Sequence, residues 1–215
     1  MEIAKGGMSW ILSEFSIFII FSLGYLLTDN FLQSVFLLLS VLSGLLTLFF
    51  LIFFRDPIRT IGKGIVAVAD GSIREIDSIQ DDDIGPAWFI STFMNIYHVH
   101  VNRMPIEGTI KNMTHIPGSH LPAYKKESDR NERVIILVET KKGLVKIVLI
   151  AGTIARRIVP YIKKGETLKK GEKISLIRLG SRVDVYLPKK MNITVNVNVK
   201  DRVKAGGSTI ATSDV

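Results

Sequence analysis

Two long apolar runs, separated by a short polar break, dominate the first quarter of the chain. Residues 10–27 (WILSEFSIFIIFSLGYLL) contain a single charge, Glu14, and residues 31–54 contain none. At about 1.5 Å per residue, a helix over residues 10–27 is ~27 Å long, close to the thickness of the hydrocarbon core of a bilayer. The pattern predicts that residues 1–54 form a transmembrane helical hairpin, with Glu14 near the interface or facing the other helix.

Basic residues lie outside both predicted spans: Lys5 precedes the first, and Arg55, Arg59 and Lys63 follow the second. The positive-inside rule then places both termini and the rest of the chain on the cytoplasmic side of the cell membrane. A cleaved signal peptide is disfavoured because the first run lacks a strongly basic start and a small-residue cleavage site. A soluble core hairpin is disfavoured because small cores rarely hold such long uncharged runs.

After residue 54 the pattern changes to short runs of Val, Ile and Leu punctuated by glycine, such as GIVAVADGSI and EKISLIRLGSRVDVYLP. Strand-like runs with turn signals every ~8–12 residues are typical of a β-sandwich or barrel. We therefore predict a mainly β domain with few short helices over residues 55–215.

Some local patterns in this domain predict individual elements. ETKKGLV (139–145) predicts a hairpin with Lys142-Gly143 at its turn. Residues 193–199 (ITVNVNV) alternate strictly, which predicts one shared face for Ile193, Val195, Val197 and Val199. The polar stretches 80–85 and 125–133 are predicted to be exposed loops.

Charge is distributed unevenly along the chain. The net charge is +8; residues 1–54 have one basic and three acidic residues, so residues 55–215 carry +10. A basic domain joined to an apolar segment predicts a phospholipid surface as partner, rather than nucleic acid. The absence of cysteine excludes disulfides, cysteine-ligated zinc and a cysteine nucleophile.

Two histidines, His98 and His100, lie two positions apart in NIYHVHVNR. If this run is a strand, their side chains leave the same face, where they could bind a metal or line a catalytic pocket. A zinc site needs a third protein ligand, and the spacing does not choose between His115, His120 and Asp70.

Asp70 and Gly180-Ser181 each have an ordinary structural explanation when taken alone. Asp70 precedes a glycine at the end of an apolar run, as in an Asp-Gly turn. Gly180-Ser181 interrupts two strand-like runs, as a bulge does.

Taken together, these segments closely resemble the short form of the phosphatidylserine decarboxylase family, whose archaeal members are called archaetidylserine decarboxylases. VHVNRMP and RLGSRVD are the most specific pieces. The resemblance covers nearly all of residues 53–188, in the expected order, through FFRDPIR (53–59), VAVADGSI (66–73), FMNIYHVHVNRMPIEGTI (93–110), NER (131–133), LIAGTIARRIV (149–159) and KKGEKISLIRLGSRVDVYLP (169–188).

The resemblance implies a proenzyme that cuts itself between Gly180 and Ser181 into a β chain (1–180) and an α chain (181–215). Ser181 would become a pyruvoyl group that forms a Schiff base with a serine phospholipid and accepts the electrons left by CO2. Asp70 matches the processing aspartate of the family, and His100 matches its motif histidine and is the best proton donor. No metal is implied.

Arginines near these motifs suit the phosphate or carboxylate of such a substrate because their fork binds two oxygens. On this basis we expect substrate-binding roles for Arg103, Arg178 and Arg182. Longer family members have HxxHMP, and aligning on Met104-Pro105 places His100 on the first histidine and Arg103 on the second. Either His98 substitutes for the missing histidine or His100 serves both steps.

Two other functions compete with this reading. A membrane-anchored adaptor or fusion-type β-domain protein would leave VHVNRMP unexplained and would need coiled-coil heptads, which the sequence lacks. An HxH zinc peptidase would need an upstream histidine, and none precedes His98. Under the favoured reading the partners are the lipid substrate, the membrane and the chain's own two fragments, with a higher oligomer left open. An ether-linked and an ester-linked lipid fit equally well.

Overall fold

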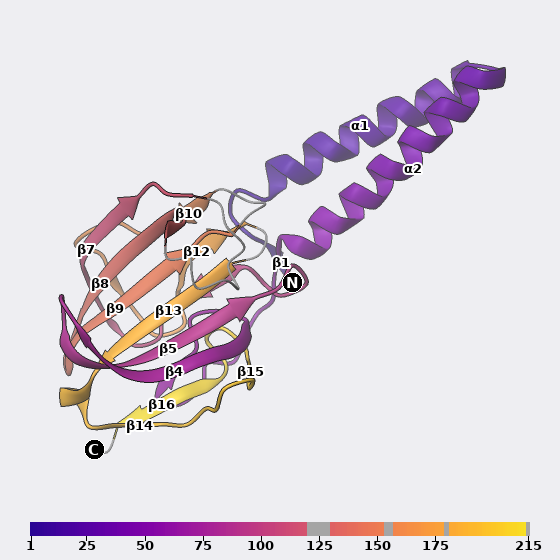
Figure 1. Cartoon of the computed structure of the whole chain (residues 1–215). Coiled ribbons are helices and arrows are strands. Elements are labelled where there is room, and N and C mark those ends of the chain that lie inside the picture. Colours follow the sequence, from indigo (N-terminus) through magenta and orange to yellow (C-terminus); the bar gives the residue numbers. More distant parts are fainter. Residues whose placement is uncertain (120–129, 153–156, 179–180, 214–215) are drawn as a thin grey trace. The chain divides into compact units, whose positions relative to one another are not determined.

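The computed structural model describes residues 1–119, 130–152, 157–178 and 181–213. The chain divides into two compact units, Met1–Ile58 and Arg59–Val215. The first is helical and the second is almost entirely β (Figure 1). The predicted class, a helical hairpin followed by a mainly β domain, is confirmed.

The first unit is a pair of apolar helices, α1 (Met8–Leu27) and α2 (Asn30–Phe53). Both are long and apolar enough to cross a membrane, with mean hydropathies of 1.8 and 2.7. The short strands β1 (Glu2–Ile3) and β2 (Arg55–Asp56) pair where the chain enters and leaves the hairpin. The predicted spans agree with the observed helices to within two residues.

Polar and small residues lie between the two helices, and most of the large apolar side chains face outward. Ser40, Ser43 and Thr47 are buried in α2, and the Ser22 and Ser40 hydroxyls are 2.8 Å apart across the helix pair. A Cβ on Gly24 would lie 2.6 Å from the Phe36 ring, so glycine allows that close contact. This arrangement suits a hydrocarbon solvent, where small and hydrogen-bonding residues join helices, and it indicates association with a membrane.

The second unit is a sandwich of antiparallel sheets. An eight-stranded sheet has the order β11-β7-β8-β9-β13-β5-β4-β15. Its strands are β4 (Gly71–Asp81), β5 (Gly85–Met94), β7 (Gly108–Ile116), β8 (Arg133–Thr140), β9 (Gly143–Ile150), β11 (Thr167–Leu168), β13 (Ser181–Pro188) and β15 (Arg202–Val203).

Two three-stranded sheets complete this unit. One has the order β10-β12-β6 and the other β14-β16-β3. Their strands are β3 (Ile65–Val66), β6 (Val101–Arg103), β10 (Ile158–Pro160), β12 (Lys173–Ile177), β14 (Ile193–Val195) and β16 (Thr209–Ser213), and a 3-10 turn, η2 (Lys189–Met191), follows β13.

Strand β13 runs through the middle of the large sheet, paired with β5 on one side and β9 on the other. Its side chains alternate: Val183, Val185 and Leu187 belong to the hydrophobic core, and Arg182, Asp184 and Tyr186 line hollows on the other face. Because successive side chains of a strand point to opposite faces, Ser181 shares the core face with Val183.

The predicted hairpin of residues 139–145 is confirmed, but its turn is displaced by one residue. Thr140 pairs with Gly143, so Lys141 and Lys142 form the turn and Gly143 begins β9. The Thr140 hydroxyl donates to the Gly143 carbonyl at 2.6 Å. Gly143 has φ 134°, a conformation that favours glycine and sets the register here.

The alternation of residues 193–199 persists for only part of the segment. Ile193, Val195 and Val197 pack against the core, as predicted, but Val199 is exposed. The strand ends at Val195, and the chain turns at Val199 and Lys200, where Lys200 has φ 80°. The turn breaks the period of two, so the prediction is wrong for Val199.

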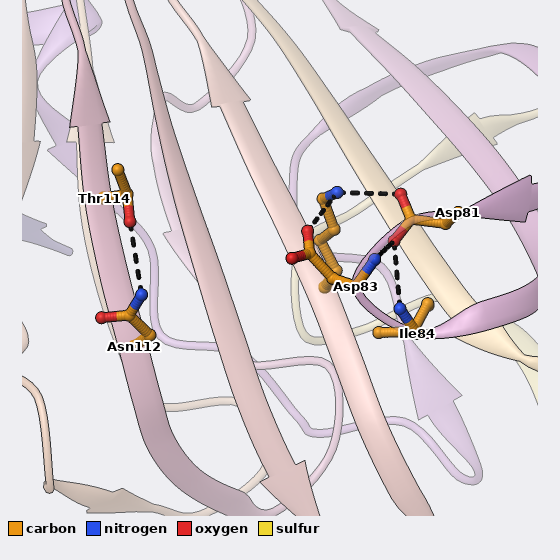
Figure 2. A network of polar contacts seen from close by, with 6 residues as sticks. Asp81, Asp83, Ile84, Asn112 and Thr114 are labelled. Carbon is orange, nitrogen blue, oxygen red and sulfur yellow. Dashed lines mark hydrogen bonds and ion pairs between the residues drawn. The ribbon is translucent and has the colours of Figure 1, made fainter.

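The segment 80–85 contains the tight turn between β4 and β5, and Asp82 and Asp83 are exposed there as predicted (Figure 2). The Asp81 carboxylate accepts hydrogen bonds from the Asp83 and Ile84 backbone N–H groups, at 3.0 and 3.3 Å. Lys146 of β9 donates to both Asp81, at 2.8 Å, and Asp83, at 2.6 Å. Burial would lower the pKa of Lys146, but the bonds to the two carboxylates outweigh it and raise that pKa. Of the other predicted loop, residues 125–129 lie outside the described residues, and the prediction is wrong for Asn131, which is fully buried, and for Arg133, which begins β8.

Candidate active site

Ser181 is the first residue of β13, at the point where the chain crosses from the small β10-β12-β6 sheet to the large sheet. Strand β12 ends at Ile177, and Gly180, the other half of the predicted cleavage site, lies outside the described residues. Ser181 pairs with Met94 of β5 and is fully buried. Within the described part of the chain, its hydroxyl makes no hydrogen bond.

Asp70 ends the segment that leads into β4, and its carboxylate is held from two sides. One oxygen accepts from the Arg59 guanidinium at 2.7 Å, and the other accepts from the Ala205 backbone N–H at 2.8 Å. A Cβ on the following residue, Gly71, would collide with the carbonyl oxygen of Phe93, so β4 begins in close contact with β5. Asp70 and Ser181 therefore lie at the same end of the large sheet, on either side of β5.

The two histidines of NIYHVHVNR do not form a pair on one strand face. Residues 98–100 precede β6, which begins at Val101, so the condition for a shared strand face is not met. His98 Nδ1 accepts from the Asn95 N–H at 3.0 Å, and His100 Nδ1 lies 2.8 Å from the His98 carbonyl oxygen. Because a carbonyl only accepts, His100 carries a proton on Nδ1; Nε2 is an acceptor when the ring is neutral and a donor when it is protonated. His100 is fully buried.

Backbone pairing brings His100 to the same end of the sandwich as Asp70 and Ser181. The Ile177 N–H at the end of β12 donates to the His100 carbonyl at 3.2 Å. The Arg103 N–H donates to the Val68 carbonyl at 2.8 Å, so β6, which follows His100, runs beside the segment that ends at Asp70.

The three arginines expected at the site have different surroundings. Arg103 is buried, and its Nη1 donates to the Gly171 carbonyl at 3.1 Å. Arg182 donates through both Nε and Nη2 to one oxygen of Asp184, at 3.0 and 2.7 Å, on the face of the large sheet opposite Ser181. Arg178 is half-buried, and burial together with the neighbouring Arg157 lowers its pKa.

Two shallow hollows of about 250 and 330 Å³ lie on that opposite face, and Arg182 and Tyr186 line both. They are therefore separated from Ser181 by the sheet itself.

In the described ranges no three His, Asp or Glu side chains are grouped closely enough to hold a metal ion. Of the third ligands considered, His115 bonds Glu132 at 3.1 Å, and Asp70 is held by Arg59. His120 lies outside the described residues.

A family comparison matches residues 46–211 to phosphatidylserine decarboxylase. The chain belongs to the phosphatidylserine decarboxylase family. The match spans Ser181, Asp70 and His100, and it confirms the resemblance in VHVNRMP and RLGSRVD.

Relatives from archaea and bacteria agree with this membership. The chain is 39% identical over 214 residues to an archaetidylserine decarboxylase proenzyme by name from Methanococcoides burtonii, covering 97% of this chain and 95% of the relative. A protein of the same name from Methanosarcina acetivorans is 39% identical over 98% of this chain and 96% of the relative. A phosphatidylserine decarboxylase proenzyme of Streptomyces avermitilis is 44% identical over 149 residues, 69% of this chain and 67% of the relative. The archaeal relatives align along almost their whole length, so the short form is supported.

Sequence reasoning missed the contacts of two polar residues that lie within the family motifs. Arg59, which holds Asp70, is the last residue of FFRDPIR, a segment that carried the resemblance without an assigned role. Asn131 of NER is fully buried, accepts from the Ser119 hydroxyl and donates to the Ala151 carbonyl at 2.9 Å. A polar residue between two charged neighbours gives no periodic signal of burial, so the motif itself was the available clue.

Proposed function

We propose that the chain is a self-processing, pyruvoyl-dependent decarboxylase that converts a serine phospholipid to the ethanolamine phospholipid and CO2. Membership of the phosphatidylserine decarboxylase family supports the reaction, and the relatives' proenzyme names support processing. The observation that carries the proposal is Ser181: a fully buried serine, with a hydroxyl that bonds no described residue, at the start of a central strand.

In processing, the Ser181 hydroxyl attacks the Gly180 carbonyl and converts the peptide bond to an ester. Elimination across Cα and Cβ of Ser181 then releases residues 1–180 and leaves a dehydroalanine, which loses ammonia on hydrolysis to give a pyruvoyl terminus. A hydroxyl is a weak nucleophile at its own pKa and needs a nearby base. Asp70, held by Arg59 and Ala205 at this end of the sheet, and His100 are the proposed groups for this step.

Cleavage at this point would leave the fold intact. Strand β13, the start of the α chain, is paired with β5 of the β chain along its whole length and with β9 from Arg182 to Tyr186. Strands β15 and β16 of the α chain pair with β4 and β3. Because the new end lies at a crossover between sheets, no strand is cut, and we expect the two fragments to remain one body under native conditions.

In decarboxylation, a pyruvoyl group at position 181 would supply an electron sink for the pair left by departing CO2. His100 is the proposed proton donor to the resulting carbon. Its Nδ1 is committed to the His98 carbonyl, so a protonated ring would present Nε2–H as the transferable proton. Full burial of His100 would keep competing water away from this proton.

The helical hairpin would hold this active site at a membrane. The basic residues that flank α1 and α2 favour a cytoplasmic catalytic domain. Archaetidylserine and phosphatidylserine are both candidate substrates, because relatives carry both names. Ser181 and His100 would act on the headgroup, so they do not distinguish ether-linked from ester-linked lipid chains.

The intact mass of the full chain, purified in detergent beside a Ser181→Ala variant, tests processing. Two species, residues 1–180 and residues 181–215 with a pyruvoyl terminus, are expected for the wild type, and one uncleaved chain for the variant. Release of CO2 from each of the two serine lipids tests the reaction. A well-folded wild-type chain that remains uncleaved would refute the self-processing mechanism.

A further inference from the structure

Two arginines face each other across the small β10-β12-β6 sheet. Ile158 pairs with Ile177, Val159 with Leu176 and Pro160 with Ser175, so the same register sets Arg157 opposite Arg178. The Arg178 N–H donates to the Arg157 carbonyl at 3.4 Å, which shows that the pairing continues to these residues. Cross-strand neighbours have Cβ atoms roughly 4.5–5.5 Å apart, so the two side chains start from neighbouring positions.

In the absence of a bound anion, this pair of arginines destabilises the folded protein. Like charges directly opposite each other in a sheet are destabilising. Arg178 is also half-buried, and burial together with Arg157 lowers its pKa. Two neighbouring arginines suit an anion with several oxygens, since each guanidinium group can donate two parallel hydrogen bonds.

The pair lies next to the groups that the proposed reaction uses. Arg178 is separated from Ser181 by two residues, and the preceding Ile177 bonds the His100 backbone. Arg157 precedes β10 by one residue and Arg178 follows β12 by one residue, so both lie at one end of the small sheet. A lipid headgroup could reach over this end with its serine toward Ser181 and its phosphate toward the arginines.

The chemistry favours the phosphodiester over the carboxylate as the bound anion. An arginine on the carboxylate would stabilise the charge that must be lost as CO2, and so would bind the ground state more tightly than the transition state. The phosphodiester keeps its charge through the reaction.

We infer that Arg157 and Arg178 together bind the phosphodiester of the serine phospholipid, which holds the headgroup while its amine reaches position 181. This inference rests on the proposed decarboxylase function, and it adds Arg157 as a substrate-binding residue.

Two measurements on the full chain in neutral detergent test the pair. The first is CO2 release from a short-chain, water-soluble phosphatidylserine by Arg157→Gln and Arg178→Gln, with the fraction of cleaved chain determined for each. The second is calorimetric binding of glycerophosphoethanolamine, which has the phosphodiester but no carboxylate. Arg202→Gln, an exposed basic residue of β15, is the matched control.

Loss of one charge-assisted contact is expected to raise KM, and to weaken glycerophosphoethanolamine binding, by at least about tenfold. The value of kcat and the cleaved fraction should change less than about threefold, and Arg157→Lys should recover part of the binding. In phosphate-free buffer Arg157→Gln should match or exceed the wild-type Tm, because it removes a repulsion.

An unchanged KM, an equal effect in Arg202→Gln, or a fall in kcat alone would overturn the inference. An effect seen only with substrate in anionic vesicles would assign the pair to bulk membrane lipid and would also overturn it. Binding that depends on Arg157 in a chain that releases no CO2 would preserve the phosphodiester site and reject the reaction. Normal CO2 release by the wild type, with glycerophosphoethanolamine binding unchanged in Arg157→Gln, would support the reaction and reject the phosphodiester site.

Discussion

Replacing Arg59 by methionine would leave the Asp70 carboxylate with the Ala205 N–H as its one hydrogen-bond donor within the described residues. The Arg59 and Asp70 side chains are only 10% and 11% exposed. Removing one partner of a buried ion pair costs about 3–5 kcal/mol. Because both groups keep a little water contact, we expect Arg59→Met to lower the free energy of unfolding by about 3 kcal/mol. For a chain of this size that corresponds to a fall in Tm of roughly 6–12 °C.

The same change should slow self-cleavage. If Asp70 acts in processing, its position depends on Arg59, and a displacement of about 1 Å of a reacting group can reduce a rate about a hundredfold. We expect Arg59→Met to slow the appearance of the α chain by at least about tenfold. Asp70→Asn should block cleavage outright, because an amide is not a base.

Equilibrium unfolding of the full chain in detergent measures the first effect, in a Ser181→Ala background that keeps every molecule uncleaved. The chain has two tryptophans, and Trp10→Phe leaves Trp88 of β5 as a reporter of the β unit alone. Combining Arg59→Met with Asp70→Asn should cost less than the sum of the single changes, with a coupling of about 1.5–3 kcal/mol.

Arg202→Met makes the same chemical change at an exposed position and serves as the control. A loss of stability below about 0.5 kcal/mol for Arg59→Met, or a cleavage rate equal to that of the control, would refute the role assigned to the ion pair.

Three further changes should have defined effects, each measured by unfolding of the uncleaved chain. Lys146→Met leaves the nearly buried Asp81 carboxylate without its cation and should lower the free energy of unfolding by about 2–4 kcal/mol. Because folding raises the pKa of Lys146, the stabilisation is complete below the ordinary lysine pKa of 10.5 and is lost as pH rises through the raised pKa. The stabilities of variant and wild type should therefore converge only at strongly alkaline pH. Gly71→Ala forces a methyl group against the Phe93 carbonyl and should cost about 2 kcal/mol or more, while no loss would show that β4 can move. Asn131→Ala removes the donor to a buried carbonyl and should cost about 1–3 kcal/mol, whereas a change under about 0.5 kcal/mol would mean that water replaces it.

Elements that depend on nearby residues could be predicted from the sequence. The hairpin helices follow from long apolar runs, and their bounds are correct to within two residues. The β8–β9 hairpin follows from a glycine between two apolar runs, but its turn is one residue from the predicted place because Thr140 closes the pair with Gly143. Val199 breaks the predicted alternation because a turn ends the strand, and periodicity alone does not mark that end.

The candidate residues came from motifs, and their environments came from packing. Ser181, Asp70 and His100 were identified by resemblance, without information on what holds them. The ion pair between Arg59 and Asp70 joins two residues whose contact no sequence motif or hydrophobic period predicts. His98 and His100 suggested a shared strand face, but backbone hydrogen bonds fix both rings outside a strand.

The sequence by itself determined the apolar hairpin, the β character of the rest and the family, because hydrophobic period and motif letters are local properties. Only the tertiary structure decided that Ser181 begins a central strand at a crossover between sheets, that Arg182 faces away from it and that Arg157 lies opposite Arg178. These facts depend on strand register, where a shift of one residue moves every side chain to the other face. Register is set by contacts between segments distant along the chain, so the order of residues alone leaves it open.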